Sequence, residues 1–150
     1  MKHDQSQELC LLLFTIKDRL DTLFSAVAQS CQVTPMQMVI LLYLKRDTSS
    51  SLKELRNKLN LNQGNTSTLC KNMEQNGLLR RVRDEKDERI VRLSLTSTGL
   101  NVASRLEHCL QQLSQALESC PAAQVEPIYH GMQQTAQILA HLSSVVQQPN

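Results

Sequence analysis

Residues 62–81, NQGNTSTLCKNMEQNGLLRR, decide which fold the chain adopts. Their first third holds Asn, Gln, Gly, Thr and Ser, of which all but Gln lower helix propensity, yet the apolar residues that follow have helical spacing. Gly77 comes directly after Asn76, where a helix favours a left-handed C-cap residue. The segment is therefore predicted to be a helix that begins with small polar side chains and leads into a strand.

A short helix is expected just before this segment. Ser51 and Glu54 have the spacing of a capping box, and the helix that they open runs through Lys58. Only residues 59–61 separate it from the next helix. A helix, a tight turn and a second helix are typical of a helix-turn-helix, here at about 51–76.

Two basic segments with β propensity follow, LLRRVR at 78–83 and RIVRLSLT at 89–96. The wholly charged stretch DEKDE joins them, so a β-hairpin with a charged tip is predicted. A hairpin directly after a helix-turn-helix is the layout of a winged helix, and the wing is expected at about 78–96.

Helices are predicted on both sides of this core. Residues 5–30 and 97–118 carry apolar side chains at helical spacing, with Thr96 as the cap of the second. Such amphipathic helices do not stand alone well, so an obligate dimer is expected. The fold class is therefore mainly α with a small β-hairpin wing, a winged helix-turn-helix core flanked by N- and C-terminal dimerisation helices.

Proline positions help to place two further helices. Thr34 and the glutamine three residues later form a second capping box, and Pro35 suits the first position of a nearly all-apolar helix over 35–46. A last helix is expected from near Pro121. It tolerates Pro127 only if that residue lies in or near its first turn.

Composition narrows the functional class. The 150 residues are 41% hydrophobic and 20% charged, which indicates one domain with a core rather than a disordered chain. Residues 45–92 carry twelve Lys or Arg against seven Asp or Glu, a net charge of +5, whereas the rest carries −3. This basic middle fits a nucleic-acid surface, and a solvated charged face is the alternative. The chain lacks the pattern of a signal peptide and any apolar run that could cross a bilayer, so a cytoplasmic protein without membrane contact is expected.

The sequence gives little indication of an enzyme or of a metal-binding protein. The sequence has no phosphate-binding glycine loop, HExxH or GxSxG motif, so it predicts no catalytic residues and no cofactor. Five cysteines without a CxxC pair argue against a disulfide framework or a zinc ribbon, and no metal site is expected.

The polar start of the helix over 62–76 is suited to a DNA groove. At 100° per residue, Thr66, Leu69, Cys70 and Met73 share the face that packs on the domain, and the small polar residues and Lys71 share the opposite face. Asn62 is the expected cap. Small side chains allow a close approach, and Gln and Asn are the residues that bind adenine in a bidentate manner.

Ordered motifs give the chain a family resemblance. The segment carries Gly77-Leu78-Leu79 after the second helix, Asp87-Glu88-Arg89 in the wing, and a closing Leu95-Thr96-Ser97-Thr98-Gly99. It resembles the winged helix-turn-helix core of the MarR (multiple antibiotic resistance regulator) family. The similarity covers about 33–100, and the helices at 5–32 and 97–146 match the dimerisation helices of that family in length and placement.

The resemblance implies a homodimeric transcription regulator, usually a repressor, that binds a palindromic double-stranded DNA operator and is released by a small aromatic effector. It also implies that the second helix enters the major groove, and that Arg89 enters the minor groove with Asp87 orienting it. The residues expected to contact DNA are Ser51, Gln63, Gly64, Asn65, Thr66, Ser67, Thr68, Lys71, Arg83, Asp87 and Arg89.

Two alternatives stay open. Some members of the family sense organic peroxides through a thiol on the first helix, and Cys10 is a candidate redox residue in a comparable place. Phe14 and Phe24 lie where those sensors are expected to offer tyrosine hydroxyls, which favours a buried structural cysteine instead. The other alternative is a winged-helix module that binds proteins rather than DNA.

Overall fold

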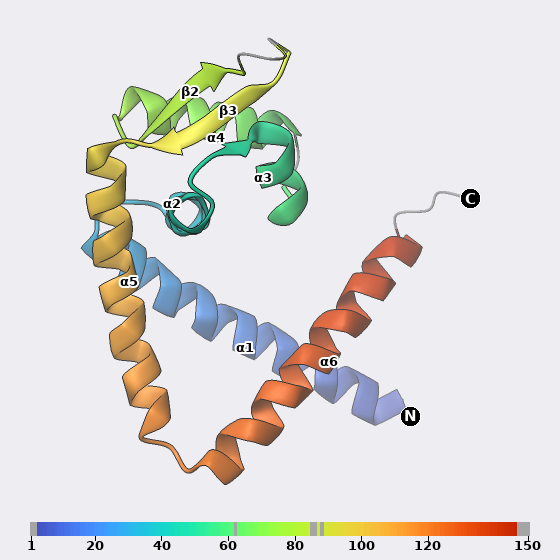
Figure 1. The fold of residues 1–150 in the computed structure, drawn as a ribbon. Helices are drawn as coiled ribbons and strands as arrows, with labels where there is room; N and C mark the ends of the chain where they lie inside the picture. The colour runs from blue at the N-terminus through green and yellow to red at the C-terminus, as the bar shows by residue number, and fades with distance from the viewer. Residues whose placement is uncertain (1–2, 62, 85–86, 88, 147–150) are drawn as a thin grey trace. The chain divides into compact units, whose positions relative to one another are not determined.

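The computed structural model describes residues 3–61, 63–84, 87 and 89–146, and it confirms a mainly helical chain with a small antiparallel sheet (Figure 1). The elements are α1 (His3–Ser30), α2 (Pro35–Arg46), β1 (Ser50–Ser51), α3 (Leu52–Lys58), α4 (Gln63–Gln75), β2 (Leu79–Arg83), β3 (Val91–Leu95), α5 (Ser97–Glu118) and α6 (Ala122–Val146). The chain forms two compact units, Met1–Leu110 and Gln111–Asn150. The first unit extends from α1 into α5 and includes the sheet, and the second holds the end of α5 and α6.

Both predicted capping boxes are present and fix where helices begin. The Thr34 hydroxyl accepts the Gln37 N–H at 3.3 Å, and the Gln37 side chain accepts the Thr34 N–H at 2.9 Å. Ser51 and Glu54 form the same pair at 3.1 and 2.7 Å before α3. Each box satisfies two backbone donors that no helical carbonyl can reach. The predicted cap of α4, Asn62, lies outside the described residues.

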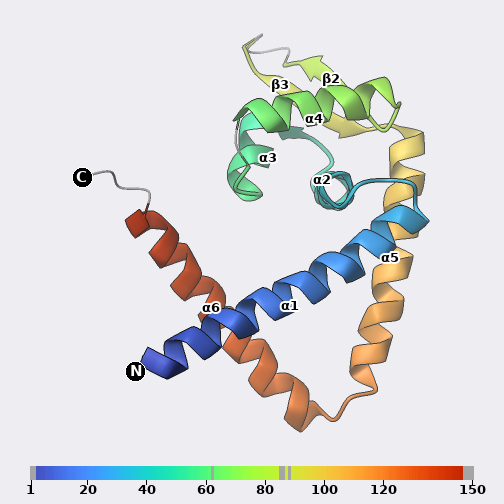
Figure 2. The same ribbon diagram turned by 180° about the vertical axis from the view of Figure 1, so that it is seen from behind.

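The core of the first unit forms around α2, as its nearly all-apolar sequence predicted. The two opposite views show α2 almost end-on between α3 and α5, with the sheet to one side (Figures 1 and 2). Side chains from all of these elements are almost fully buried, and each contributes about 1.5–3 kcal/mol through removal of apolar surface from water. The largest are Ile40, Leu41, Leu44, Leu55, Met73, Leu79, Leu93 and Leu106.

The sheet has the strand order β1-β3-β2. The predicted hairpin is confirmed, with β2 and β3 antiparallel and Leu79 opposite Leu95. The third strand, β1, was not predicted. It is only Ser50 and Ser51, pairing with Leu93 and Arg92, and two serines in a polar loop carry no alternation that could reveal a strand.

The end of α4 has the left-handed cap that the sequence predicted. Gly77 adopts φ +68°, its N–H donates to the carbonyl of Glu74, and the N–H of Leu78 donates to the carbonyl of Met73, both at 2.9 Å. This pair of hydrogen bonds is a Schellman motif, in which the residue after the glycine packs back on the helix. Leu78 and Met73 are both buried, so the motif carries its apolar contact.

The first and last family motifs meet at a wing-base junction formed by Gly77, Leu78, Thr96 and Gly99. The Thr96 hydroxyl donates to the Gly77 carbonyl at 2.5 Å and accepts the Gly99 N–H at 3.0 Å, which confirms Thr96 as the cap of α5. The Thr96 N–H donates to the Leu78 carbonyl at 3.2 Å. Gly99 is buried so close to this carbonyl that a Cβ would lie 1.9 Å from the oxygen. The junction therefore requires a glycine, and it joins α4, both wing strands and α5.

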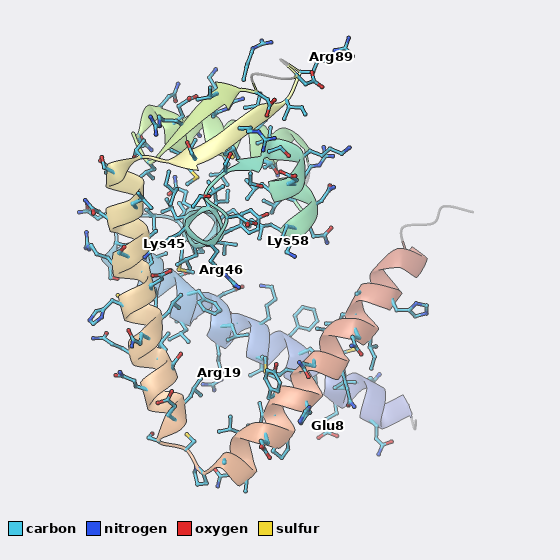
Figure 3. All side chains as sticks on the ribbon, in the orientation of Figure 1. Glu8, Arg19, Lys45, Arg46, Lys58 and Arg89 are labelled. Atoms are coloured by element: carbon cyan, nitrogen blue, oxygen red, sulfur yellow. The ribbon has the colours of Figure 1, made fainter. Side chains whose placement is uncertain are left out.

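Polar contacts attach α5 to the rest of the first unit. Lys45 on α2 contacts Glu107 at 2.5 Å and Ser104 at 2.9 Å, and it lies where α2 faces α5 (Figure 3). The Arg105 guanidinium, also on α5, donates to the carbonyl of Ser30 at 3.1 Å. These bonds hold the first half of α5 against α2 and the end of α1.

The terminal helices keep apolar side chains exposed. On α1 these include Leu11 and Phe14, which are 68% and 70% exposed, and on α6 they include Ile128 and Ile138, at 60% and 59%. Pro127 is the sixth residue of α6, near the start of that helix. No single described helix is both long and apolar enough to cross a membrane, and one bent pair, residues 7–30 with 35–46, passes that test by length and composition alone.

Replacing Gly99 with alanine is expected to lower the free energy of unfolding by about 3 kcal/mol, because the new methyl group would force apart backbone atoms of the wing-base junction. Chemical denaturation followed by circular dichroism measures this. Gly64→Ala is the matched control, since Gly64 is also near the start of a helix but has no atom within 4 Å of the position that a Cβ would occupy. Equal stability of both variants would contradict the proposed role of the junction.

Candidate nucleic-acid interface

The helix α4 has one buried and one exposed face, with the phase that its sequence predicted. Cys70 and Met73 are fully buried, and the residues on the opposite side are exposed or half-buried. Of the predicted DNA contacts, Gly64, Asn65, Thr68 and Lys71 are exposed and Ser67 is half-buried. Gln63 begins α4, and its side chain lies outside the described part of the chain.

Thr66 does not belong to the exposed set. It is only 1% exposed, because it lies on the same face of α4 as Cys70 and Met73. Helix phase alone already placed it there, so including it among the DNA contacts conflicted with that phase. Thr66 therefore lies on the inner face of α4, away from the exposed residues of that helix.

The thiol on the inner face of α4 is unreactive at neutral pH. Burial raises the pKa of the Cys70 thiol to about 11, and the nearby Arg81 offsets this only in part. At neutral pH the thiol therefore stays protonated and serves as an apolar packing group. Glu74, on the same helix, accepts the backbone N–H of Arg81 at 3.0 Å, which fastens α4 to β2.

Two carboxylates shape the tip of the wing. Asp84 accepts the N–H of Asp87 at 3.2 Å and the guanidinium of Arg92, which raises the pKa of Arg92. Asp87 in turn accepts the N–H of Arg89 at 3.0 Å, and its carbonyl accepts the N–H of Ile90 at 2.9 Å. The bond from Asp87 thus goes to the backbone of Arg89, and it sets the direction from which the exposed side chain leaves the wing tip (Figure 3).

The arginines of the wing divide into two groups. Arg81 is half-buried beside Glu74, with 4.0 Å between the charged groups, and Arg92 pairs with Asp84. These two arginines hold the wing together. Arg80, Arg83 and Arg89 form the second group and are exposed, as is Arg92 despite its pair with Asp84.

Ser51 is half-buried at the start of α3, where its hydroxyl accepts a hydrogen bond from the Glu54 N–H. The same capping pair, with the Ser51 backbone N–H as the main cause, holds the pKa of Glu54 below its usual range. Ser51 is therefore a structural cap in this fold, whatever else it contacts.

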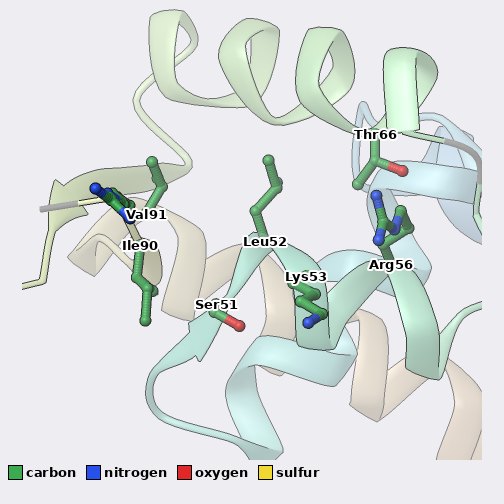
Figure 4. Close-up of a pocket in the computed structure, with 8 residues that line it drawn as sticks. Ser51, Leu52, Lys53, Arg56, Thr66, Ile90 and Val91 are labelled. Atoms are coloured by element: carbon green, nitrogen blue, oxygen red, sulfur yellow. The ribbon is translucent and has the colours of Figure 1, made fainter. Parts of the chain in front are cut away.

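A cavity of about 430 Å³ lies between α3, α4 and the tip end of the wing (Figure 4). Three cationic residues line it: Lys53 and Arg56 from α3, and Arg89 from the wing. Ser51 and Thr66 add hydroxyl groups, and the apolar part of the wall is Leu52, Ile90 and Val91. In the close-up the Arg56 side chain points from α3 toward Thr66 on α4.

Lys53 and Arg56 were not among the residues predicted to contact DNA. The available signal was their i, i+3 spacing, which puts both on one face of a short helix. What the sequence does not show is that this face lies beside the wing, because that depends on how α3 and β3 pack.

We looked next for side chains in the described part of the chain that could bind a metal ion or form a disulfide. That part holds no group of three His, Cys, Asp or Glu side chains that could bind a metal ion. The cysteines at 10, 31, 70, 109 and 120 are all free thiols. Cys10 is exposed on α1 in the single chain.

Proteins similar to this chain include a transcriptional regulator and proteins of the MarR family. The organic hydroperoxide resistance transcriptional regulator of Bacillus subtilis is 33% identical over 92 residues, 61% of this chain and 63% of its own length. A MarR family protein from Bacillus stearothermophilus is 28% identical and superposes with a TM-score of 0.74, covering 93% of this chain and 99% of that one. A mutant MarR from E. coli complexed with operator DNA shares the fold at 19% identity, with a TM-score of 0.78 over 88% of this chain and 96% of that one.

The family model described as "Transcriptional regulator SarA/Rot" matches residues 22–106, more than half of the chain. That range contains the helix-turn-helix, the wing and the wing-base junction. The chain therefore belongs to the SarA/Rot family of transcriptional regulators and has the winged helix-turn-helix fold of MarR proteins.

Proposed function

We propose that this regulator binds double-stranded DNA in a sequence-specific manner, with α4 in the major groove. The main support is that α4 has one buried face and one exposed face. Its inner face is buried, and its outer face exposes small polar groups, the Asn65 amide and Lys71. An amide side chain can form two hydrogen bonds with adenine, and small neighbours let the helix come close to the base edges.

The wing supplies the second contact. Arg89 is exposed at the wing tip, and its backbone is fixed by Asp87. A guanidinium is attracted to a narrow minor groove, where the negative potential is strongest. We assign Arg89 to the minor groove beside the major-groove site of α4, with Arg83 at the neighbouring phosphates. The DNA-bound MarR neighbour from E. coli supports this assignment at the level of the fold.

A homodimer is part of the proposal. Exposed apolar side chains on α1 and α6 are unfavourable in water and suit a second copy of the chain. A two-fold dimer presents two copies of α4, and its symmetry predicts a palindromic operator with half-sites about one helical turn apart. The proposed regulator works as a repressor in the cytoplasm, is released by a small aromatic effector, and catalyses no reaction.

Two substitutions separate the roles of helix and wing. Arg89→Ala is expected to weaken binding to every duplex and to lower the salt dependence by about one counterion. Asn65→Ala should instead reduce discrimination between the preferred duplex and others by about 1–3 kcal/mol. Fluorescence anisotropy over a salt series measures both effects, with Arg19→Ala on α1 and Gln75→Ala at the far end of α4 as controls. Variants that bind all duplexes as the wild type does would show that this surface does not contact DNA.

The dimer can be tested without DNA. Size-exclusion chromatography with light scattering is expected to give twice the 16.9 kDa of one chain at micromolar concentration. Phe14→Asp should shift the protein toward monomer, because a charge on the exposed apolar face of α1 would have to be buried. A stable wild-type monomer would contradict the proposed dimer.

Peroxide sensing is the second candidate function, favoured by the exposed Cys10 and by the relative that is named for hydroperoxide resistance. If Cys10 is the sensor, cumene hydroperoxide weakens DNA binding by the wild type and leaves Cys10→Ser unaffected. Cys120→Ser serves as the control, since Cys120 is also exposed. Unchanged DNA binding by the oxidised wild type would eliminate this candidate.

A further inference from the structure

We propose that the cavity between α3, α4 and the tip end of the wing binds a phosphodiester group of the DNA backbone, with Lys53 and Arg56 as its principal contacts. This inference rests on the proposed DNA binding, and it assigns a role to two residues outside the predicted set. It also names a place on the protein where affinity, rather than sequence discrimination, is produced.

The charge of the cavity favours an anion. The eight described residues that line it include Lys53, Arg56 and Arg89 but no carboxylate. Lys53 and Arg56 lie one turn apart on α3, and Arg89 lines the same space from the wing. A phosphodiester carries one negative charge and accepts hydrogen bonds from both ammonium and guanidinium groups, so its charge and its acceptor oxygens match this lining.

The shape of the cavity also fits a backbone segment. Its volume of about 430 Å³ lies in the range of small-ligand sites, and is larger than one phosphate alone would occupy. The cationic groups come from two sides, and Leu52, Ile90 and Val91 give the wall an apolar part. Sugar carbons on either side of the phosphate can contact that apolar part while the phosphate oxygens face the cations.

The position of the cavity connects it to the base-contacting surface. Thr66 lines the cavity from α4, and the residue immediately before it, Asn65, is exposed on the proposed groove face. A phosphate held here would fix the height and register of α4 over the base edges, since backbone contacts position a protein without carrying sequence information. The cavity would thus place one strand of the duplex between α4 and the wing.

Two of the wing arginines are paired with carboxylates of the protein. Arg81 and Arg92 are paired with Glu74 and Asp84, so they contribute less to an outward field than their number suggests. Lys53 and Arg56 supply cationic groups from α3 next to Arg89 instead. Affinity for the backbone therefore comes from α3 and the wing together.

Charge-removing substitutions on one helix test the proposal. Lys53→Gln and Arg56→Gln are each expected to weaken binding to any duplex. Each should also lower the slope of log affinity against log salt concentration by about 0.9. When salt rises from 50 to 200 mM, the fold loss of affinity should therefore be about threefold smaller for each variant than for the wild type. Lys58→Gln is the matched control. Lys58 belongs to the same helix but lines a different cavity, with Tyr43 and Asp47, at the end of α3 away from Arg89 (Figure 3).

The probe is a defined duplex of mixed sequence, followed by fluorescence anisotropy, and thermal melting checks that each variant folds. Lys53→Arg and Arg56→Lys keep the charge and should keep the wild-type salt slope, which separates lost charge from lost packing. Unchanged salt slopes in both Gln variants, or an equal change in Lys58→Gln, would overturn the phosphate site while wild-type binding stays intact. If the wild type binds no duplex at all, the proposed function fails and the phosphate site fails with it.

Discussion

The close contact between Gly99 and the carbonyl of Leu78 is the constraint on which the first unit depends. Only a residue without a side chain permits it, and through it the start of α5 reaches the turn that ends α4. Thr96 adds a hydroxyl that bonds to Gly77 on one side and to Gly99 on the other. Because α4 and the wing share this junction, the helix that is proposed to contact bases and the wing that carries Arg89 are joined by one set of hydrogen bonds.

Holding α4 in this way permits a sequence that would not form a stable helix alone. Its first turns contain residues that lower helix propensity, and burial of Cys70 and Met73 together with the Schellman motif offsets that cost. Packing therefore does not determine the residues of the outer face, which can be small and polar so that α4 approaches a partner closely. Poor helix formers on a well-anchored helix are therefore informative about function, since packing does not require them.

Local patterns made much of this fold predictable. The capping boxes at Thr34 and Ser51, the left-handed Gly77 and the hairpin all depend on residues close together in sequence, and the structure confirms them. The two-residue strand β1 is too short to leave a pattern. The last helix was expected as well, and it continues past Pro127 because that residue lies near its start. The candidate site was less predictable, because its residues are brought together by packing. The position of Lys53 and Arg56 beside Arg89 depends on how α3 meets the wing, whereas helix phase already indicated the burial of Thr66.

The central claim is that α4 and the wing form one surface for specific recognition of double-stranded DNA. Selection of duplexes from a random pool by the wild-type protein, followed by affinity measurement at physiological salt, tests it most directly. A surface of this kind is expected to enrich a palindrome with two half-sites about one helical turn apart, bound at least about 10³-fold more tightly than mixed-sequence duplex. Failure to enrich any sequence, with equal affinity for selected and unselected duplexes, would contradict it.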